Sequence, residues 1–177
     1  IPLSPPYMGR CPGPMTRTVA DAALMMASVA QPDDRDYSEL PPPVIDWNAF
    51  EVDPSFLKGK RVALHMDAGC GLPLDPQIAQ AVRDAAKRIE AAGAHVEEIP
   101  AFMTPQMLQG MDHFWRMRSC LDMQAMSAEQ RAKILPYIRE WAESAAGFSG
   151  ADVFDGYSQI VATRGATVAA TKAYDFV

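Results

Sequence analysis

The side chains that could act as nucleophiles lie in settings that are typical of structural residues. Hydrolysis needs an activated Ser or Cys beside a base, together with donors for an oxyanion. Ser149 follows Gly147-Phe148 and precedes Gly150, which is not the G-x-S-x-G pattern, and it is better explained as a helix cap. Cys120 lies in a helical pattern, where burial as a small apolar side chain is the default. The residues alone therefore identify no catalytic group.

The residues that could bind a metal or a phosphate lack the spacing such sites need. His65, His95 and His113 show no H-x-x-x-H spacing, and the acidic run at 33–36 lacks the register and the distal Glu of a calcium loop. The glycine-containing loop at 67–71 fits neither phosphate-binding pattern. We interpret these features as structural or surface histidines, a solvated turn and a flexible βα loop. No metal site and no cofactor are expected.

Composition and charge exclude several classes of partner. The chain has 177 residues, of which 49% are hydrophobic and 21% charged, and this is enough for a real core. Its net charge is -6, and it has no cluster of Lys and Arg like those with which proteins contact nucleic-acid phosphates. The most apolar stretch, 19–30, is much shorter than the roughly 20 residues that cross a bilayer. We expect no nucleic-acid partner and no membrane partner.

The cysteines and the chain ends give two further expectations. The chain has three cysteines, Cys11, Cys70 and Cys120, an odd number with no CxxC pair among them. They suit neither a disulfide framework nor a CxxC metal or redox site, which favours a reducing cytoplasm. The chain opens at Ile1 without an initiator Met and stops at 175–177 in what resembles the first residues of a strand. We therefore expect a piece of a longer protein, with exposed apolar surface and a tendency to self-associate.

The first third of the chain contains one expected helix between two proline-containing segments. Residues 1–17 form a Pro-rich connecting segment, because proline and glycine block a helix there. The pattern [ST]-x-x-[DE] at Thr18 then predicts a helix over 18–30, and this helix is apolar on every face and so expected to be buried. Residues 31–59 are predicted to be a surface crossover.

Residues 60–100 have the pattern of a βαβ unit. A short apolar strand begins after Lys60, and Asp75-Pro76 supplies an N-cap followed by proline at the first helical position. Apolar residues recur at helical spacing until Gly93, and a second strand follows at 95–99. Two strands joined through a helix are expected to be parallel.

Residues 103–172 are predicted to form a helical cover. Helices are expected to begin at Thr104-Pro105, at the capping box of Ser127 and at that of Ser149, with a break at Pro136. The inner side of the last helix is predicted to carry Val153, Tyr157, Ile160, Val161, Arg164 and Val168.

A specific resemblance joins these segments. Gly13-Pro14-Met15-Thr16-Arg17-Thr18-Val19-Ala20-Asp21-Ala22-Ala23-Leu24-Met25 closely resembles the segment that follows the active-site region in the amidase signature family. Residues 31–36, 57–63 and 75–97 resemble, in the same order, that family's acidic turn, next strand, and next helix and strand. The resemblance implies an α/β fold over 1–177: one partial amidase domain, whose βαβ unit belongs to a larger mixed sheet with several additional helices.

The same resemblance implies amide hydrolysis by a Ser, cis-Ser, Lys triad in the parent protein. In the family the Lys and the glycine- and serine-rich signature precede the Gly-Pro-Met-Thr-Arg segment, and here only 1–12 precede it. None of the five lysines matches a catalytic position, and none of the nine serines has a signature-like setting. We assign no catalytic residue in this chain and expect it to be inactive alone. The alternative is a non-catalytic binding or assembly domain on an amidase-like scaffold.

The resemblance also assigns substrate specificity to variable helices, here 103–148. Clefts for organic ligands are mostly apolar and aromatic, and an Arg can hold a carboxylate through its planar fork. The alternative for the apolar candidates is that they belong to the core. The alternative for the Arg is an internal ion pair. Expected partners are a small-molecule amide and further copies of the chain in a homo-oligomer. The substrate-pocket candidates are Met111, Phe114, Trp115, Tyr137, Trp141 and Arg164.

Overall fold

The computed structural model describes residues 13–33, 45–47, 53 and 55–177. The chain divides into two compact units, Ile1–Pro54 and Ser55–Val177. Most of the expected Pro-rich segment at 1–17 and most of the expected crossover at 31–59 lie outside the described residues.

The first unit contains helix α1, Val19–Val29, which confirms the helix expected over 18–30. The Thr18 hydroxyl oxygen accepts a hydrogen bond from the Asp21 N–H at 3.1 Å, as the sequence pattern predicts. The expected burial is wrong: Ala23 is the buried residue of α1, whereas Leu24 is 70% exposed. Burial needs a partner, and among the described residues of this unit no second helix or strand accompanies α1.

The second unit begins with the βαβ unit that the sequence predicts. Strand β1, Arg61–Leu64, and strand β2, His95–Glu98, are parallel, with Arg61 opposite His95, and helix α2, Pro76–Ala91, connects them. The Asp75 carboxylate caps α2 by accepting from the Gln77 N–H at 2.7 Å. Gly93 follows the helix with φ of 100°, a conformation that favours glycine.

The last residues of the chain add to the free edge of β1. The Ala63 N–H donates to the Phe176 carbonyl at 2.9 Å, and Val62 and Phe176 form a parallel bridge. The Asp175 carboxylate accepts from the Arg61 N–H at 2.8 Å, and this bond, together with Lys60 at 3.5 Å, lowers the pKa of Asp175. Of the strand expected to begin at 175–177, the structure therefore shows a single bridge at Phe176.

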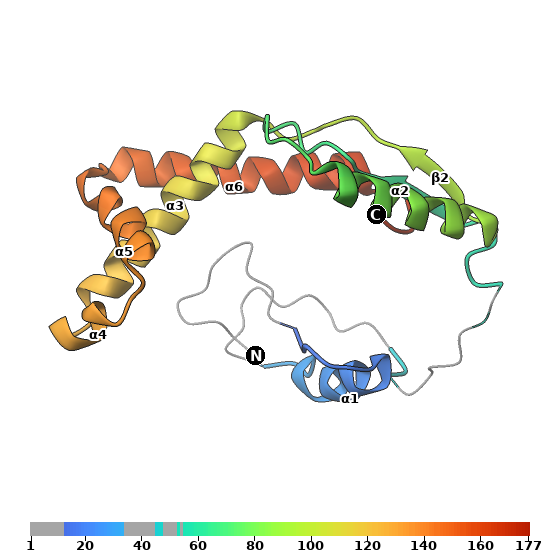
Figure 1. The fold of residues 1–177 in the computed structure, drawn as a ribbon, viewed down its shortest axis with the longest axis horizontal. Coiled ribbons are helices and arrows are strands. Elements are labelled where there is room, and N and C mark those ends of the chain that lie inside the picture. Colours follow the sequence, from blue (N-terminus) through green and yellow to red (C-terminus); the bar gives the residue numbers. More distant parts are fainter. Residues whose placement is uncertain (1–12, 34–44, 48–52, 54) are drawn as a thin grey trace. The chain divides into compact units, whose positions relative to one another are not determined.

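The remaining elements are helices that begin where the sequence predicts (Figure 1). Thr104, Ser127 and Ser149 cap three of them through their hydroxyl oxygens, and the last two form complete capping boxes. Pro136 is the first residue of another, since its missing N–H needs no partner there. The elements are α3 (Pro105–Gln124), α4 (Ala128–Ala132), α5 (Pro136–Glu143), the 3-10 helix η1 (Ser144–Gly147) and α6 (Gly150–Thr171).

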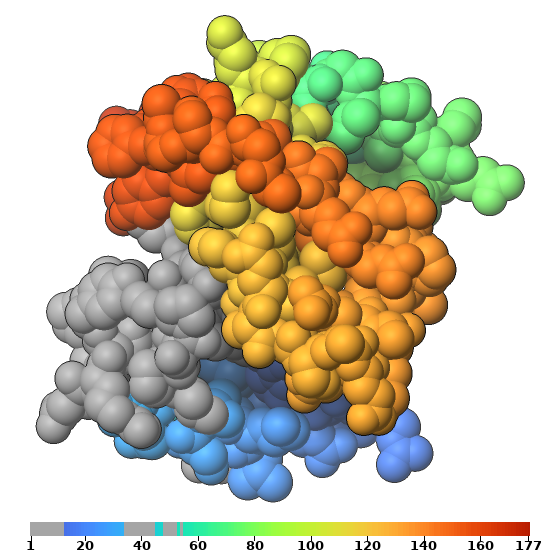
Figure 2. Space-filling view, turned by 90° about the vertical axis from the view of Figure 1, so that its left-hand side faces the viewer, coloured from blue at the N-terminus to red at the C-terminus, as the bar shows by residue number. Residues whose placement is uncertain are grey.

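Helices α3 and α6 pack together through two glycines, Gly110 and Gly156, and both are buried. A β-carbon on Gly156 would lie 2.8 Å from the Gly110 carbonyl oxygen, so the two backbones are in direct contact. Figure 2 looks at the end of this layer, where the surface of α3 (yellow) lies against that of α6 (orange to red). The glycine pair therefore fixes how closely and at which turn the helices meet.

The contact also corrects the predicted inner side of α6. Gly156 and Ile160 are buried against α3, and Val153 is half-buried. Val161, Arg164 and Val168, also expected on the inner side, are exposed. Tyr157 is partly exposed but does face α3, with its ring centroid 6.1 Å from that of Phe114. The face of α6 that meets α3 is therefore centred on Gly156 and Ile160 rather than on Val161 and Val168.

Replacing Gly156 by alanine tests this contact. Gly156→Ala would place a β-carbon against backbone atoms that cannot rotate away, so we expect a loss of about 1–3 kcal/mol in the free energy of unfolding. Gly165→Ala is the matched control, because nothing lies within 4 Å of a β-carbon there, and a gain of up to about 1 kcal/mol is expected. Urea unfolding followed by circular dichroism measures both. Equal gains for the two variants would contradict a close helix crossing.

Candidate functional site

The six predicted pocket residues do not converge on one pocket. Phe114 faces α6 from α3, and Trp141 on α5 contacts the opposite side of α3. Trp115 occupies a third face of α3, where the Arg118 guanidinium carbon lies 5.1 Å from its ring centroid. Helical spacing puts the half-buried Met111 on that same third face.

The other two candidates are on the surface. Tyr137 on α5 is 67% exposed. Arg164 on α6 is exposed as well, and no ion pair between described residues includes it. The internal ion pair weighed for Arg164 is therefore not formed within the described part of the chain.

A shallow apolar groove of about 510 Å³ lies between α3 and the start of α6. The rings of Phe114 and Tyr157 face each other across it, with centroids 6.1 Å apart. No carboxylate, imidazole or amine lines it, so the groove can bind apolar groups and has no general base of its own. Its lining residues are Phe114, Met117, Leu121, Phe148, Ser149, Gly150, Val153, Phe154 and Tyr157.

Only Phe114 of this lining was among the sequence candidates. A signal for two others was present, since Val153 and Tyr157 recur at helical spacing after the capping box of Ser149. Phe148 comes from the turn that the same capping box fixes. Combining that turn with the apolar positions of α3 would have located the groove.

Ser149 acts at the rim of the groove as a helix cap, as expected. Its hydroxyl accepts from the Asp152 N–H at 3.2 Å and donates to the Asp152 carboxylate at 2.7 Å. The Ser149 N–H donates to the same carboxylate at 2.8 Å. These bonds from the Ser149 hydroxyl and N–H lower the pKa of Asp152, and a carboxylate with a lowered pKa is a poor base. Ser149 is thus held for structure rather than activated for attack.

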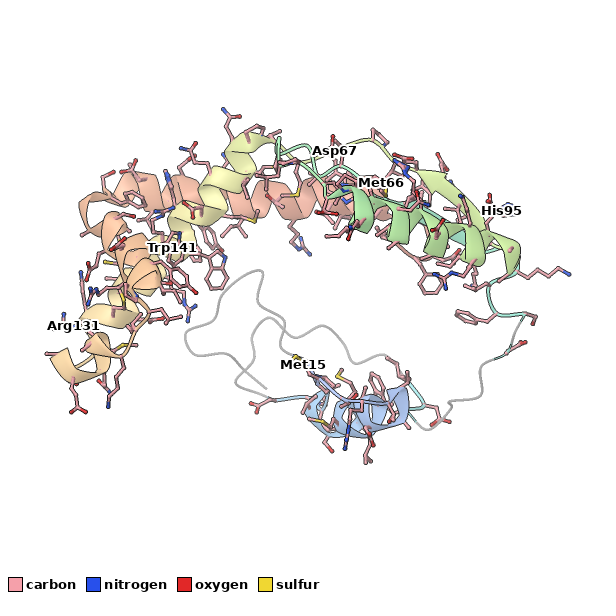
Figure 3. The ribbon with its side chains drawn as sticks, viewed as in Figure 1. Met15, Met66, Asp67, His95, Arg131 and Trp141 are labelled. Carbon is pink, nitrogen blue, oxygen red and sulfur yellow. The ribbon has the colours of Figure 1, made fainter. Side chains whose placement is uncertain are left out.

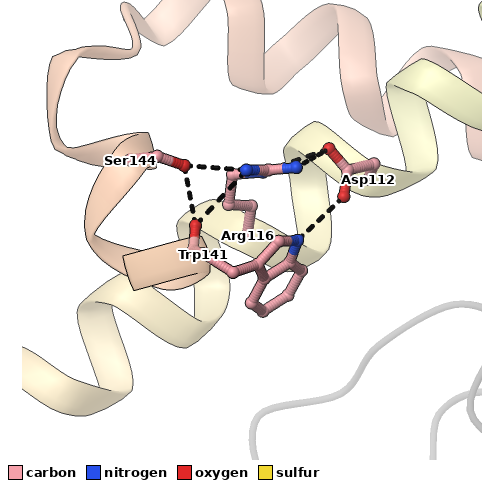
Figure 4. A network of polar contacts seen from close by, with 4 residues as sticks. All are labelled: Asp112, Arg116, Trp141 and Ser144. Carbon is pink, nitrogen blue, oxygen red and sulfur yellow. Dashed lines mark hydrogen bonds and ion pairs between the residues drawn. The ribbon is translucent and has the colours of Figure 1, made fainter. Parts of the chain in front are cut away.

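Trp141 belongs to a polar network that joins α3 to α5 and η1 (Figure 4). Its indole N–H donates to the Asp112 carboxylate at 3.0 Å, and the other oxygen of that carboxylate accepts from the Arg116 guanidinium. Arg116 also donates to the Ser144 hydroxyl at 2.8 Å, and its guanidinium carbon lies 5.4 Å from the centroid of the Trp141 ring. The indole N–H and the guanidinium are both engaged in this network, which holds the helices together.

The loop after β1, where Figure 3 marks Met66 and Asp67, packs against the segment that leads into α3. The Asp67 carboxylate accepts from the Gly69 N–H at 2.8 Å, and Gly69 has φ of 83°. A β-carbon on Gly69 would collide with the Met103 carbonyl. The loop therefore uses its glycine for close packing against the segment before α3.

Two histidines of the described part of the chain pack against phenylalanine rings, and its cysteines are free. His65 stacks on Phe102 with ring centroids 4.6 Å apart, and the ring of His113 lies 4.7 Å from that of Phe148. Cys120 is buried in α3, as expected, and Cys70 is half-buried; neither forms a disulfide. No three His, Cys, Asp or Glu side chains among the described residues gather closely enough to hold a metal ion.

The helices in the described part of the chain do not have the dimensions of membrane spans. None of them combines the length and the apolar character that crossing a bilayer requires.

The network around Trp141 predicts a strong dependence on Asp112. Asp112→Ala would leave the indole N–H and the guanidinium without their shared acceptor, so we expect a loss of about 1–3 kcal/mol in unfolding free energy. Asp122→Ala is the matched control, because the exposed Asp122 pairs with Arg118 at 3.2 Å within α3, and about 0.5 kcal/mol or less is expected. Thermal and urea unfolding measure both. Equal losses would show that the network does not tie α5 to α3.

Comparison with known sequences identifies the family. A family model described as Amidase matches residues 8–160, more than half of the chain. A glutamyl-tRNA(Gln) amidotransferase subunit from Cyanothece sp. is 36% identical over 87 residues, which cover 49% of this chain and 17% of that protein. The protein of the same name from Chromohalobacter salexigens is 41% identical over 87 residues, with the same coverage. The chain thus spans about a sixth of the length of these relatives.

Comparison of structures agrees with the sequences. A bacterial aryl acylamidase that belongs to the amidase signature enzymes superimposes with a TM-score of 0.64. The match covers 91% of this chain and 33% of that chain, at 24% sequence identity, and it shows the mixed α/β fold. The resemblance drawn from the segment beginning at Gly13 is thereby confirmed, and the chain belongs to the amidase family.

Proposed function

We propose that this chain is part of an amidohydrolase that cleaves the C–N bond of a carboxamide. The observation that carries the proposal is the family match over residues 8–160, which runs through both units of the chain. It supports treating the two units as parts of one amidase domain. The free Cys70 and Cys120 support a reducing compartment, and we place the reaction in the cytoplasm.

We infer that the chemistry is performed by a Ser, cis-Ser, Lys triad from outside this chain. In such a triad the Lys deprotonates the bridging Ser, which activates the nucleophilic Ser to attack the amide carbonyl. The C–N bond then breaks with loss of the amine, and water hydrolyses the resulting ester. Within this chain, the Ser149 hydroxyl is a cap and the groove carries no base, which favours an auxiliary role here.

The contribution of the chain would be to bind the substrate. The groove between α3 and α6 has a volume in the range of small-molecule sites and an apolar, aromatic lining. Phe114 is the sequence candidate that this role fits best, and Met111 and Trp115 remain candidates for a second wall on the third face of α3. Trp141 is better explained by its bond to Asp112.

The alternative, a binding or assembly domain without catalysis, rests on the lack of any assigned catalytic residue in this chain. Activity assays separate the two. With an aryl amide as substrate, we expect no turnover by the 177-residue chain and turnover by a longer protein that includes a Gly-Gly-Ser-Ser-Gly-Gly-like signature upstream. Turnover by the chain alone that survives repurification and is blocked by a serine-directed reagent would overturn the first expectation. A longer protein with no turnover would favour the alternative.

The pocket candidates are tested by substrate ranking in the longer enzyme. If Phe114 contacts substrate, Phe114→Ala should change the ratio of kcat/KM between small and large amides by about 10–200-fold, since a pocket methylene is worth about 1–3 kcal/mol. Trp115→Ala tests the third face of α3 in the same way, and the exposed Tyr137 provides a control in Tyr137→Ala. A core role would instead destabilise the fold by about 3–5 kcal/mol and leave the ranking unchanged. That result for both Phe114 and Trp115 would contradict their assignment to a substrate pocket.

A further inference from the structure

The groove between α3 and the start of α6 is lined by rings and aliphatic groups rather than by charges. Four of its lining side chains are aromatic: Phe114, Phe148, Phe154 and Tyr157. Aromatic rings favour a further ring at centroid distances of about 4.5–7 Å. Among the described residues, no Lys, Arg, His, Asp or Glu lines the groove. An ionised group bound there would therefore lose its water without gaining an opposite charge.

A carboxylate stands at the rim of the groove, where α6 begins. The Asp152 carboxylate accepts hydrogen bonds from the hydroxyl and the N–H of the groove residue Ser149, at 2.7 and 2.8 Å. These bonds lower the pKa of Asp152, so this carboxylate is ionised at neutral pH. The start of a helix attracts anions, but here the protein supplies the anion itself. A ligand carboxylate would be repelled by Asp152, and the Ser149 hydroxyl has no proton left to donate to it.

We propose that the groove selects carboxamides whose bound portion is uncharged and apolar, with an aromatic ring as the preferred group, and rejects those whose bound portion carries a carboxylate. This inference rests on the proposed function, because it treats the groove as part of the substrate site of an amidase. The volume of about 510 Å³ is in the range of small-molecule sites and leaves room for a phenyl ring with a short chain. Glutamine, which carries a carboxylate beside its ammonium group, falls in the rejected class.

Leu121 is the position at which this selectivity can be changed with little effect on the fold. It lines the groove from the last turn of α3 and is 56% exposed, so replacing it removes little buried surface. Leu121→Lys would place an ammonium group at the groove, and a positive charge in the last turn of a helix is compatible with the helix dipole. Leu121→Gln is the matched control, since it also removes the leucine but adds no charge.

Turnover of three related amides by the longer enzyme tests the proposal. Phenylacetamide is the neutral amide, its para-carboxylate derivative is the charged one, and its para-acetyl derivative has the size of the charged one without the charge. We expect kcat/KM for both neutral amides to exceed that for the carboxylate at least about 100-fold. Leu121→Lys should lower this preference at least about tenfold relative to Leu121→Gln. Ala162→Lys adds the same charge at an exposed position of α6 outside the groove and should leave the preference unchanged.

Binding to the 177-residue chain separates this proposal from the proposed function, because the chain is expected to be inactive alone. In titrations followed by NMR, phenylacetamide and its para-acetyl derivative should bind at least about tenfold more tightly than the para-carboxylate. Leu121→Lys should narrow the difference, and circular dichroism verifies that each variant folds. If the chain shows this preference and the longer protein cleaves no amide, the proposed function fails and the selectivity of the groove stands.

Three results would overturn the proposal. Equal turnover of the neutral and charged amides would do so and would leave the amidase function intact. A preference that Leu121→Lys does not alter would place the selectivity outside the groove. Discrimination by the chain alone but not by the longer enzyme would show that another segment of the longer protein covers the groove, which would exclude it from the substrate site.

Discussion

The helical layer depends on the contact between the backbones of α3 and α6 at Gly110 and Gly156. Because neither residue has a side chain, the helices meet without an intervening layer, and the contact fixes their rotation as well as their separation. Next to the crossing, the rings of Phe114 and Tyr157 face each other, and the apolar groove lies there. Val161 and Val168 of α6 remain exposed beside this contact.

Helix α3 organises its neighbours by presenting a different chemistry on each face. Toward α6 it offers small and apolar groups, which bring backbones together through packing. Toward α5 it offers Asp112 and Arg116, which hold Trp141 through directed bonds. Polar networks of this kind specify one arrangement because a shifted helix would leave buried donors unsatisfied. Backbone packing therefore positions α6, whereas hydrogen bonding joins α5 to α3 alongside the packing of the buried Ala142.

Features that depend on local sequence could be predicted, and features that depend on a partner could not. The caps at Thr18, Asp75, Thr104, Ser127 and Ser149 form as expected, because a cap needs only residues within one turn. The predicted burial of α1 was wrong, because no second helix or strand accompanies it among the described residues of its unit. The predicted inner side of α6 was right for Tyr157 and Ile160 and wrong for Val161, Arg164 and Val168, because apolar spacing alone does not reveal which face meets a neighbour. For the same reason only Phe114, among six pocket candidates, lines the groove: a helix rotation of about 100° per residue separates Trp115 from it.

The bond between the Arg61 N–H and the Asp175 carboxylate joins residues 114 positions apart, and this separation affects the order of folding. Every helix from α2 to α6 lies within the loop that this bond closes. Closing so long a loop in an unstructured chain costs conformational entropy, whereas helices form from neighbouring residues within microseconds. The helices shorten the distance that the chain must search, so the pairing of Phe176 with β1 is expected to be among the last native contacts made and among the first lost.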